Sequence, residues 1–360
     1  ESTLFKFKGG IEMDTIQISI KLNEKRLEKA SYNDINHIGT YIANLESPDG
    51  YKYCDCLEVS RVGNIVVKIS YPRYFKGINA YLVTSSKQCQ IVQNDFSYEL
   101  SKHELLRGAE ISLNRVDIPF TYIMNRDYEF YSFKKVYQIF NFVYQRKNVR
   151  VDPKAYVDIA EFKAETLIYA NAKSLGGYNS KITIYNQYKN LMAKTFNDIE
   201  VNNLLREYKG LKYRMRIEVS KRIQRKEFTV KEFGIFDIFG EYAESFKNYI
   251  LENILDMETI DKIYEELASG LVDKLEAHRT FSRNFNYENF IYREIDNIYD
   301  YEILRRAVKK LNNNVKTREN AITAIRKVLL EYEREKGIIV MNTYEAILDI
   351  RETIENSFQD

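Results

Sequence analysis

The stretch that decides the fold is Lys212-Tyr213-Arg214-Met215-Arg216-Ile217-Glu218-Val219. Apolar and charged residues alternate along it, which is typical of a β-strand whose two faces meet different surroundings. The apolar side carries Tyr213, Met215, Ile217 and Val219, and the charged side carries Lys212, Arg214, Arg216 and Glu218. Strands of a buried parallel sheet are apolar on both sides, so this pattern predicts an antiparallel sheet with one covered face.

Two other stretches follow the same rule. In the segment 114–120 the core side carries Val116, Ile118 and Phe120, which leaves Arg115 and Asp117 on the other side. In the segment 181–185 the two isoleucines take the core side and leave Thr183 and Tyr185 opposite. If the three strands share one sheet, its polar side gathers two carboxylates, a tyrosine and several arginines.

The rest of the first two thirds of the chain mixes strands and helices. Alternation and turn signals predict strands at 15–22, on both sides of the turn Ser47-Pro48-Asp49-Gly50, and at 64–71, 109–120, 166–173, 181–188 and 212–223. Helical periodicity predicts helices at 97–107, 133–146 and 197–208. We therefore expect an α+β fold with a central antiparallel sheet and helices on one of its faces.

From about residue 229 onward the pattern is helical throughout. Ile260, Ile263, Leu267, Leu271 and Leu275 form one helical stripe. A second helix is expected to begin at a Thr317 cap and to end at Gly337, and a third spans 343–354. We place the boundary between an α+β domain, 1–228, and a helical C-terminal domain, 229–360, that serves DNA binding or oligomerisation.

Composition limits the class of protein. With 44% hydrophobic and 29% charged residues among 360, the chain reads as an ordinary globular protein rather than a disordered one. Its net charge of +2 means that any nucleic-acid contact must come from local clusters of cations. Neither a membrane span nor a signal peptide is evident. Three cysteines, Cys54, Cys56 and Cys89, make no disulfide framework, so we expect a reducing, cytoplasmic setting.

The residues on the polar side are suited to cutting DNA. Asp117 and Glu218 supply the hard oxygen ligands that Mg²⁺ or Mn²⁺ prefers. Tyr185 would attack the phosphorus atom, and Arg115, Arg214 and Arg216 would hold phosphate oxygens. The plainer interpretation of the same pattern is a solvated strand face with ordinary surface ion pairs.

Three motifs carry a family resemblance. The run Asn114-Arg115-Val116-Asp117-Ile118 resembles the Arg-Val-Asp-Ile element of the filamentous-phage gene II replication endonucleases and related plasmid rolling-circle initiators. The segment Thr166–Ser174 resembles the strand and loop that precede their Ile-Tyr-Asp-Lys motif, which here reads Ile184-Tyr185-Asn186-Gln187. The segment 213–219 is similar to their Leu-Arg-Ile-Glu-Val strand. Order and spacing agree across roughly residues 70 to 225.

The resemblance implies an enzyme that nicks one DNA strand at an origin and forms a 5′-phosphotyrosine. Asp117 and Glu218 would then be metal ligands and Tyr185 the nucleophile, with Tyr188 and Tyr178 as rivals. It implies origin DNA as the partner, with a host helicase and a second copy of the chain as further candidates. Gln187 stands where the family has Lys, Asn186 replaces Asp, and no His-hydrophobic-His element is present.

DNA contacts are expected from cations near these motifs. The segment 206–226 is basic and contains Tyr208 and Tyr213, which could stack an unpaired base. A solvated edge of the sheet would look the same. The residues predicted to bind DNA are Arg115, Lys173, Lys189, Lys212, Arg214 and Arg216.

Three other functions compete with this interpretation. Asp152, Glu161 and Lys163 imitate a restriction-type nuclease site, but such triplets are common in charged sequences. A tyrosine recombinase would need a His-x-x-Arg element, which we do not find before a suitable tyrosine. The main alternative is a non-catalytic DNA-binding initiator or regulator with the same fold.

Overall fold

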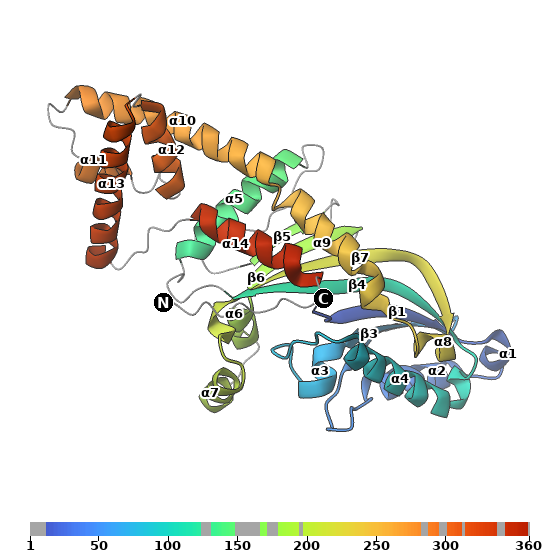
Figure 1. Cartoon of the computed structure of the whole chain (residues 1–360). Coiled ribbons are helices and arrows are strands. Elements are labelled where there is room, and N and C mark those ends of the chain that lie inside the picture. Colours follow the sequence, from blue (N-terminus) through green and yellow to red (C-terminus); the bar gives the residue numbers. More distant parts are fainter. Residues whose placement is uncertain are drawn as a thin grey trace.

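The computed structural model describes residues 12–123, 131–147, 166–170, 179–193, 197–281, 287–294, 301–311, 314–336 and 343–358. Within these residues the chain has an α+β fold, with an antiparallel sheet followed by a helical C-terminal region (Figure 1). The predicted fold class is confirmed at this level.

The sheet has seven described strands in the order β2-β3-β1-β4-β7-β6-β5, and every neighbouring pair is antiparallel. The strands are β1 (Thr15–Lys21), β2 (Cys54–Val59), β3 (Asn64–Ser70), β4 (Glu110–Ile123), β5 (Thr166–Ala170), β6 (Ser180–Asn186) and β7 (Arg214–Thr229). The two long strands β4 and β7 pair along most of their length at the centre. They carry both predicted metal ligands and three of the six residues predicted to bind DNA, Arg115, Arg214 and Arg216.

Strand register puts the predicted apolar sides together. Val116 lies opposite Ile16 on β1, and Ile118 lies opposite Val219 on β7. Ile217 in turn lies opposite Ile184 on β6. All these side chains are buried in one continuous core, as the alternation predicted. The other side of β4, β7 and β6 therefore carries the polar residues.

Helices from both halves of the chain pack on the sheet. Those of the first part are α1 (Glu24–Leu27), α2 (Tyr32–Ala43), α3 (Tyr71–Lys76), α4 (Ser86–Lys102), α5 (Tyr131–Lys147), α6 (Gln187–Met192) and α7 (Asp198–Glu207), with short 3-10 turns η1 (Glu104–Leu106) and η2 (Leu211–Tyr213). After β7 come α8 (Val230–Phe233) and α9 (Ile238–Asn253). Phe96 of α4 meets Phe233 of α8, and α9 contacts β4. Residues beyond 228 thus contribute to the core beneath the sheet.

A helical lobe follows α9. It consists of α10 (Met257–Phe281), α11 (Tyr287–Glu294), α12 (Tyr301–Leu311) and α13 (Val315–Lys336), and Figure 1 shows most of it standing away from the sheet. The chain then returns in α14 (Thr343–Glu355), which ends in a 3-10 turn, η4 (Asn356–Phe358), and contacts α5, α9 and β4. The region after residue 228 is helical in its described parts, yet its first and last helices lie on the sheet.

Arg306 of α12 joins the lobe to α14. Its guanidinium pairs with Asp261 at 2.8 Å and with Glu302 at 2.9 Å. It also lies 5.5 Å and 5.0 Å from the ring centres of Tyr264 and Tyr344. Because Tyr344 belongs to α14, this cluster of charges and rings links three helices.

Several predicted elements differ from those observed. Across the turn 47–50 an isolated antiparallel bridge pairs Glu46 with Lys52, but no strand is described between β1 and this turn. Helix α2 lies there, and it begins with a capping box between Ser31 and Asp34 that the strand prediction overlooked. Helix α4 begins at Ser86 and not near Ser97. Asn314, not Thr317, caps α13, because its side chain accepts the Thr317 backbone N–H at 3.2 Å. β6 ends at Asn186, so Tyr188 lies in a helix.

Gly39 brings α2 against the sheet. A Cβ at this position would lie 2.6 Å from Val59 Cγ2, which is too close for carbon atoms. We expect Gly39→Ala to destabilise the fold by about 1 kcal/mol, since overpacking of roughly 2 kcal/mol outweighs a helix-propensity gain of roughly 1 kcal/mol. Gly270→Ala in α10 is the matched control, because nothing lies within 4 Å of its Cβ position, and it should be neutral or stabilising. Urea unfolding of both variants measures the difference, and a Gly39→Ala as stable as Gly270→Ala would contradict the close packing.

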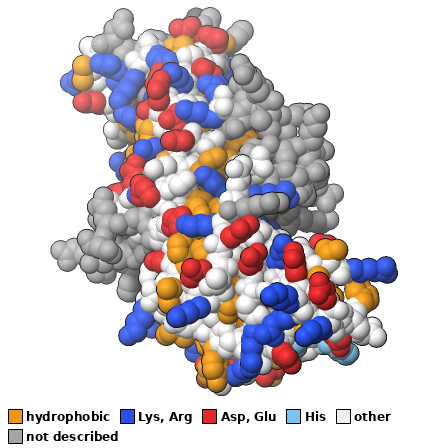
Figure 2. All heavy atoms as spheres, turned by 90° about the vertical axis from the view of Figure 1, so that its right-hand side faces the viewer, with side chains coloured by type: hydrophobic (Ala, Val, Ile, Leu, Met, Phe, Trp, Pro, Cys, Tyr) orange, Lys and Arg blue, Asp and Glu red, His pale blue; other side chains and the backbone are white. Residues whose placement is uncertain are grey.

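The described surface mixes charges of both signs. On the face shown in Figure 2, Lys and Arg side chains are interspersed with Asp and Glu. Among the helices that the structure describes, none is long and apolar enough to cross a membrane.

Candidate functional site

The candidate site is the polar face of the central strands, which we define as Asp117 and Thr121 of β4, Arg216, Glu218 and Ser220 of β7, and Lys181, Thr183 and Tyr185 of β6. Strand register arranges these side chains in rows across the sheet. Asp117, Ser220 and Lys181 form one row, Glu218 and Thr183 the next, and Thr121, Arg216 and Tyr185 the third. The three residues predicted for catalysis, Asp117, Tyr185 and Glu218, therefore lie on neighbouring strands, as the alternation indicated.

Tyr185 is enclosed within this face. Its side chain is 7% exposed, and its hydroxyl donates a hydrogen bond to Glu218 Oε2 at 3.4 Å. Burial raises the pKa of the phenol strongly, and the negative charge of Glu218 adds to the rise, whereas the neighbouring Arg216 lowers it. The phenol has an adjacent carboxylate to take its proton and an adjacent cation to stabilise the phenolate.

Asp117 and Glu218 interact with each other across the two central strands. Burial raises the pKa of Glu218 to about 7, and the charge of Asp117 contributes to this rise. Burial also raises the pKa of Asp117, although Arg115, whose Nη2 donates to Asp117 Oδ2 at 2.9 Å, acts in the opposite direction. Asp117 is 5% exposed, and its Oδ1 atom has no hydrogen-bond partner within the described structure. A side-chain hydrogen bond with Ser220 also lowers the pKa of Asp117, so this carboxylate has two polar neighbours.

Arg214 and Arg216 were predicted to contact DNA phosphates, which would require them to line an open groove. The structure buries both side chains instead. Arg216 is 1% exposed and faces Asp14 at 3.6 Å, Glu12 at 4.0 Å and the carbonyl of Asn79 at 3.4 Å. Arg214 is 4% exposed, and its Nη1 donates to the carbonyl of Ala80 at 2.8 Å. Both guanidinium groups bind the chain itself, and phosphate could reach them only after these contacts open.

Two carboxylates of the site were not predicted from the sequence. Glu12 and Asp14 precede β1 and are both buried. Glu12 accepts a hydrogen bond from Thr121, and burial raises its pKa to about 7 while Arg216 opposes the rise. The missed signal was the pair of acids two residues apart at the start of a predicted strand, since acids there must either be solvated or have a partner.

Gln187 stands where the replication initiators have the lysine of their Ile-Tyr-Asp-Lys motif, and its contacts are within the chain. It is buried at the start of α6, donates to the carbonyl of Asn79, and lies 3.5 Å from Arg214. Asn186 caps the same helix by accepting the backbone N–H of Lys189 at 3.1 Å. Both departures from the family motif therefore have structural roles at the end of β6.

Exposed cations lie beside the site at the junction of α6, α7 and η2. This basic rim consists of Lys189, Arg206, Lys209 and Lys212. α6 contacts η2, and Lys212 Nζ lies 5.8 Å from the ring centre of Tyr188. Tyr208, predicted to stack on a base, is instead buried in a small apolar cluster with Ala80, Leu191 and Leu211. Lys189 and Lys212, which were predicted to bind DNA, are both exposed in this basic rim.

Several predicted residues cannot be placed. Lys173, Tyr178, Asp152, Glu161 and Lys163 lie outside the described residues. The cysteines are free: Cys54 and Cys56 lie in β2, and Cys89 lies in α4.

The donor set suits a divalent cation chemically. Asp117 and Glu218 offer carboxylate oxygens, the atoms that Mg²⁺ and Mn²⁺ prefer as ligands. No group of three His, Cys, Asp or Glu side chains already stands in metal-binding geometry within the described ranges. The fit thus rests on two ligands and the chemistry of their oxygens.

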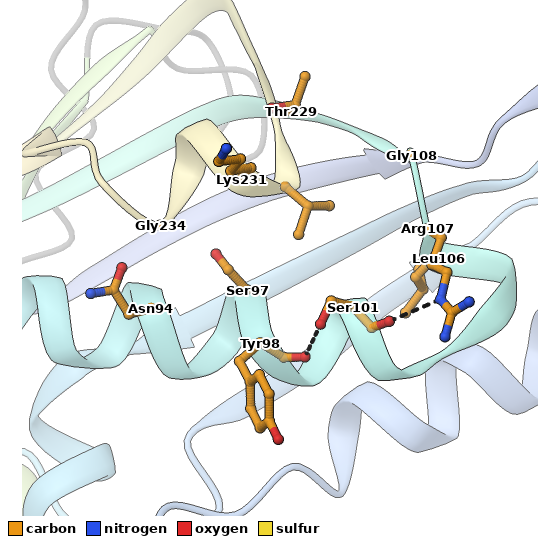
Figure 3. A pocket seen from close by; sticks show the side chains of 11 residues that line it. Asn94, Ser97, Tyr98, Ser101, Leu106, Arg107, Gly108, Thr229, Lys231 and Gly234 are labelled. Carbon is orange, nitrogen blue, oxygen red and sulfur yellow. Dashed lines mark hydrogen bonds between the residues drawn. The ribbon is translucent and has the colours of Figure 1, made fainter.

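A pocket of about 460 Å³ lies elsewhere, between α4, the turn after η1 and α8 (Figure 3). Arg107 and Lys231 are its cationic lining residues, and Arg107 Nε donates to the carbonyl of Ser101 at 3.2 Å. None of the residues of the polar face lines it. The pocket is therefore separate from the candidate site.

Comparison of the chain with protein-family models, with curated proteins and with solved structures found no match in any of the three.

Proposed function

We propose that the protein is a DNA-nicking enzyme of the rolling-circle initiator type, which cuts one strand at an origin and forms a 5′-phosphotyrosine through Tyr185. The observation that carries the proposal is the hydroxyl of Tyr185 at 3.4 Å from Glu218, with Arg216 beside it and Asp117 on the next strand. The ordered resemblance of the sequence motifs to replication initiators supports the same reaction.

The reaction is a transesterification at phosphorus. The phenolic oxygen of Tyr185 attacks the scissile phosphorus as its proton passes to Glu218. The P–O3′ bond breaks, and the 3′ oxygen leaves as a hydroxyl after taking a proton from solvent. The new phosphotyrosine ester keeps the energy of the broken phosphodiester for later rejoining.

The remaining residues supply charge. Asp117 and Glu218 would hold Mg²⁺ or Mn²⁺, which as a Lewis acid polarises the scissile phosphate when bound. Arg216 lies next to Tyr185 and stabilises negative charge on the phenolic oxygen. The basic rim offers exposed cations for the DNA backbone on the side of α6 and η2.

Burial of Tyr185 favours a second candidate, a non-catalytic DNA-binding initiator or regulator. At 7% exposure the phenol is out of reach of a phosphate until its neighbours move. In such a protein the polar face would stabilise the sheet, and the basic rim alone would contact DNA.

Covalent capture separates the two candidates. The full chain is incubated with Mn²⁺ and a randomised pool of single-stranded oligonucleotides, and adducts that survive denaturing electrophoresis are sequenced. The nicking enzyme yields an adduct at Tyr185 with an enriched DNA sequence. A protein that binds DNA in a mobility-shift assay, yet forms no adduct with the pool or with supercoiled plasmid, is the non-catalytic binder.

A further inference from the structure

Three residues before β1, Glu12-Met13-Asp14, cover part of the polar face without belonging to a strand of the sheet; we call them the acidic strap. Met13 N donates to the carbonyl of Val83 at 2.8 Å, and Tyr71 N donates to the carbonyl of Asp14 at 2.8 Å. The two acids, on either side of Met13, are 7% and 3% exposed. Because these backbone contacts lie outside the pairing of β1, the strap can leave the polar face without the opening of any strand pair.

The acids of the strap face Arg216 but do not bind it closely. Nη2 of Arg216 lies 3.6 Å from Asp14 Oδ2 and 4.0 Å from Glu12 Oε2, whereas charge-assisted hydrogen bonds measure about 2.7–2.9 Å. Nη1 of Arg216 donates to the carbonyl of Asn79 at 3.4 Å, which is also long. The Nε atoms of Arg214 and Arg216 are buried and have no hydrogen-bond partner within the described structure. Both guanidinium groups thus keep donors that the strap does not use.

These unused donors match the oxygens of a phosphate group. A buried donor without a partner costs about 1–3 kcal/mol, so its presence indicates a ligand that supplies the missing acceptor. Guanidinium groups bind two oxygens of one phosphate at once, which carboxylates at 3.6 and 4.0 Å do not reproduce. Tyr185 lies opposite Arg216 in the pairing of β6 with β7. A phosphate bound to Arg216 would therefore lie beside the phenol that is proposed to attack it.

We infer that the acidic strap occupies the phosphate site of Arg216 and keeps it closed until the backbone of a DNA strand displaces Glu12 and Asp14. This inference rests on the proposed function, because that proposal supplies the DNA substrate. Exchange of carboxylates for phosphate keeps the buried cation neutralised in both states, so opening does not leave an unpaired charge in the site. The strap is then an inhibitory contact within the chain that only DNA relieves.

Hydrogen exchange of the wild-type full chain tests the displacement directly. In the free protein the strap contacts protect the amides of Met13 and Tyr71. With a saturating pool of single-stranded oligonucleotides we expect these amides to exchange about tenfold faster or more, since their hydrogen bonds open, while amides in the paired part of β4 and β7 stay unchanged. Exchange at Met13 that DNA leaves unchanged or slows overturns the inference.

Neutralising the strap tests whether its charge competes with phosphate. We expect Asp14→Asn to tighten binding of the same oligonucleotides by about tenfold in fluorescence anisotropy, because a weaker closed state raises the fraction of open protein. Glu12→Gln should act in the same direction and replaces Asp14→Asn if that variant fails to fold. Wild-type affinity in the folded variants overturns the inference.

Glu207→Gln is the matched control for charge. Glu207 is exposed in α7 beside the basic rim and pairs with Lys76 at 3.4 Å. Its replacement removes the same charge as Asp14→Asn without touching Arg216, so the affinity for DNA should change much less. Equal tightening in Glu207→Gln and Asp14→Asn would be a general effect of net charge and overturns the inference.

The covalent-capture assay runs on the same proteins and separates this inference from the proposed function. Adducts in the wild type, together with unchanged exchange at Met13 and wild-type DNA affinity in Asp14→Asn, overturn the strap and leave the nickase intact. Faster exchange and tighter binding without any adduct support the strap and overturn the nickase.

Discussion

Replacing Tyr185 by phenylalanine is expected to abolish covalent capture of DNA, with a loss of strand cleavage of about 10⁴-fold or more, as for removal of other enzymatic nucleophiles. The substitution removes the hydroxyl oxygen that would attack phosphorus and keeps the buried ring in its packing. Because the hydroxyl makes a single long hydrogen bond within the described residues, to Glu218, the free energy of unfolding should change by about 1 kcal/mol or less. Denaturing electrophoresis of labelled DNA measures the adduct, and a mobility shift should show unchanged DNA binding.

Tyr188→Phe is the control for this experiment. Tyr188 lies three residues along the chain in α6, is partly exposed, and packs against the small cluster around Leu211. It should keep full cleavage. Cleavage that survives in Tyr185→Phe and stops in Tyr188→Phe would move the nucleophile from the strand to the helix and leave the class of enzyme unchanged.

The second large effect is expected in stability. Arg216→Ala should lower the free energy of unfolding by about 3–5 kcal/mol, because it leaves Glu12 and Asp14 as buried charges without their cation. Arg216 is also among the largest fully buried side chains of the described structure, so alanine leaves a cavity as well. Urea unfolding at neutral pH measures the loss.

Lys262→Ala provides the comparison. Lys262 pairs with Glu258 at 2.5 Å on the exposed surface of α10, four residues away in the same helix. Exposed pairs of this kind contribute about 0.3–0.5 kcal/mol. If both variants lost similar stability, the ion cluster around Arg216 would not be the internal support that its burial indicates.

Alternation along the strands was enough to predict the sheet faces. Met215, Ile217 and Val219 are buried, while Tyr213 is partly buried in η2. Asp117, Tyr185 and Glu218 lie on the opposite side of adjacent strands. The alternation of apolar and polar residues predicts which side chains share a face, because successive side chains of a β-strand point to opposite faces. The alternation does not predict which other segments cover that face. For this reason the arginines were expected at an open surface, while the structure buries them.

Residues outside regular strands could not be predicted in this way. Glu12 and Asp14 reach Arg216 from a segment with no repeating pattern, and the carbonyls of Asn79 and Ala80 reach the arginines from a loop. Their positions depend on pairing between segments far apart in the chain, such as the bridge between Met13 and Val83. A single sequence contains no direct record of such pairings.

The return of α14 to the sheet bears on how the chain can be divided. Because α14 packs on α5, α9 and β4, the helices α10 to α13 are an insertion between two elements of the sheet domain. A truncation before residue 343 would remove α14 with its buried Ile347 and Ile350. It would expose the parts of α5, α9 and β4 that α14 covers, and the shortened protein would tend to aggregate. Separating the lobe calls for excision with a linker from α9 to α14, and DNA-binding assays on that shortened chain would then report on the sheet alone.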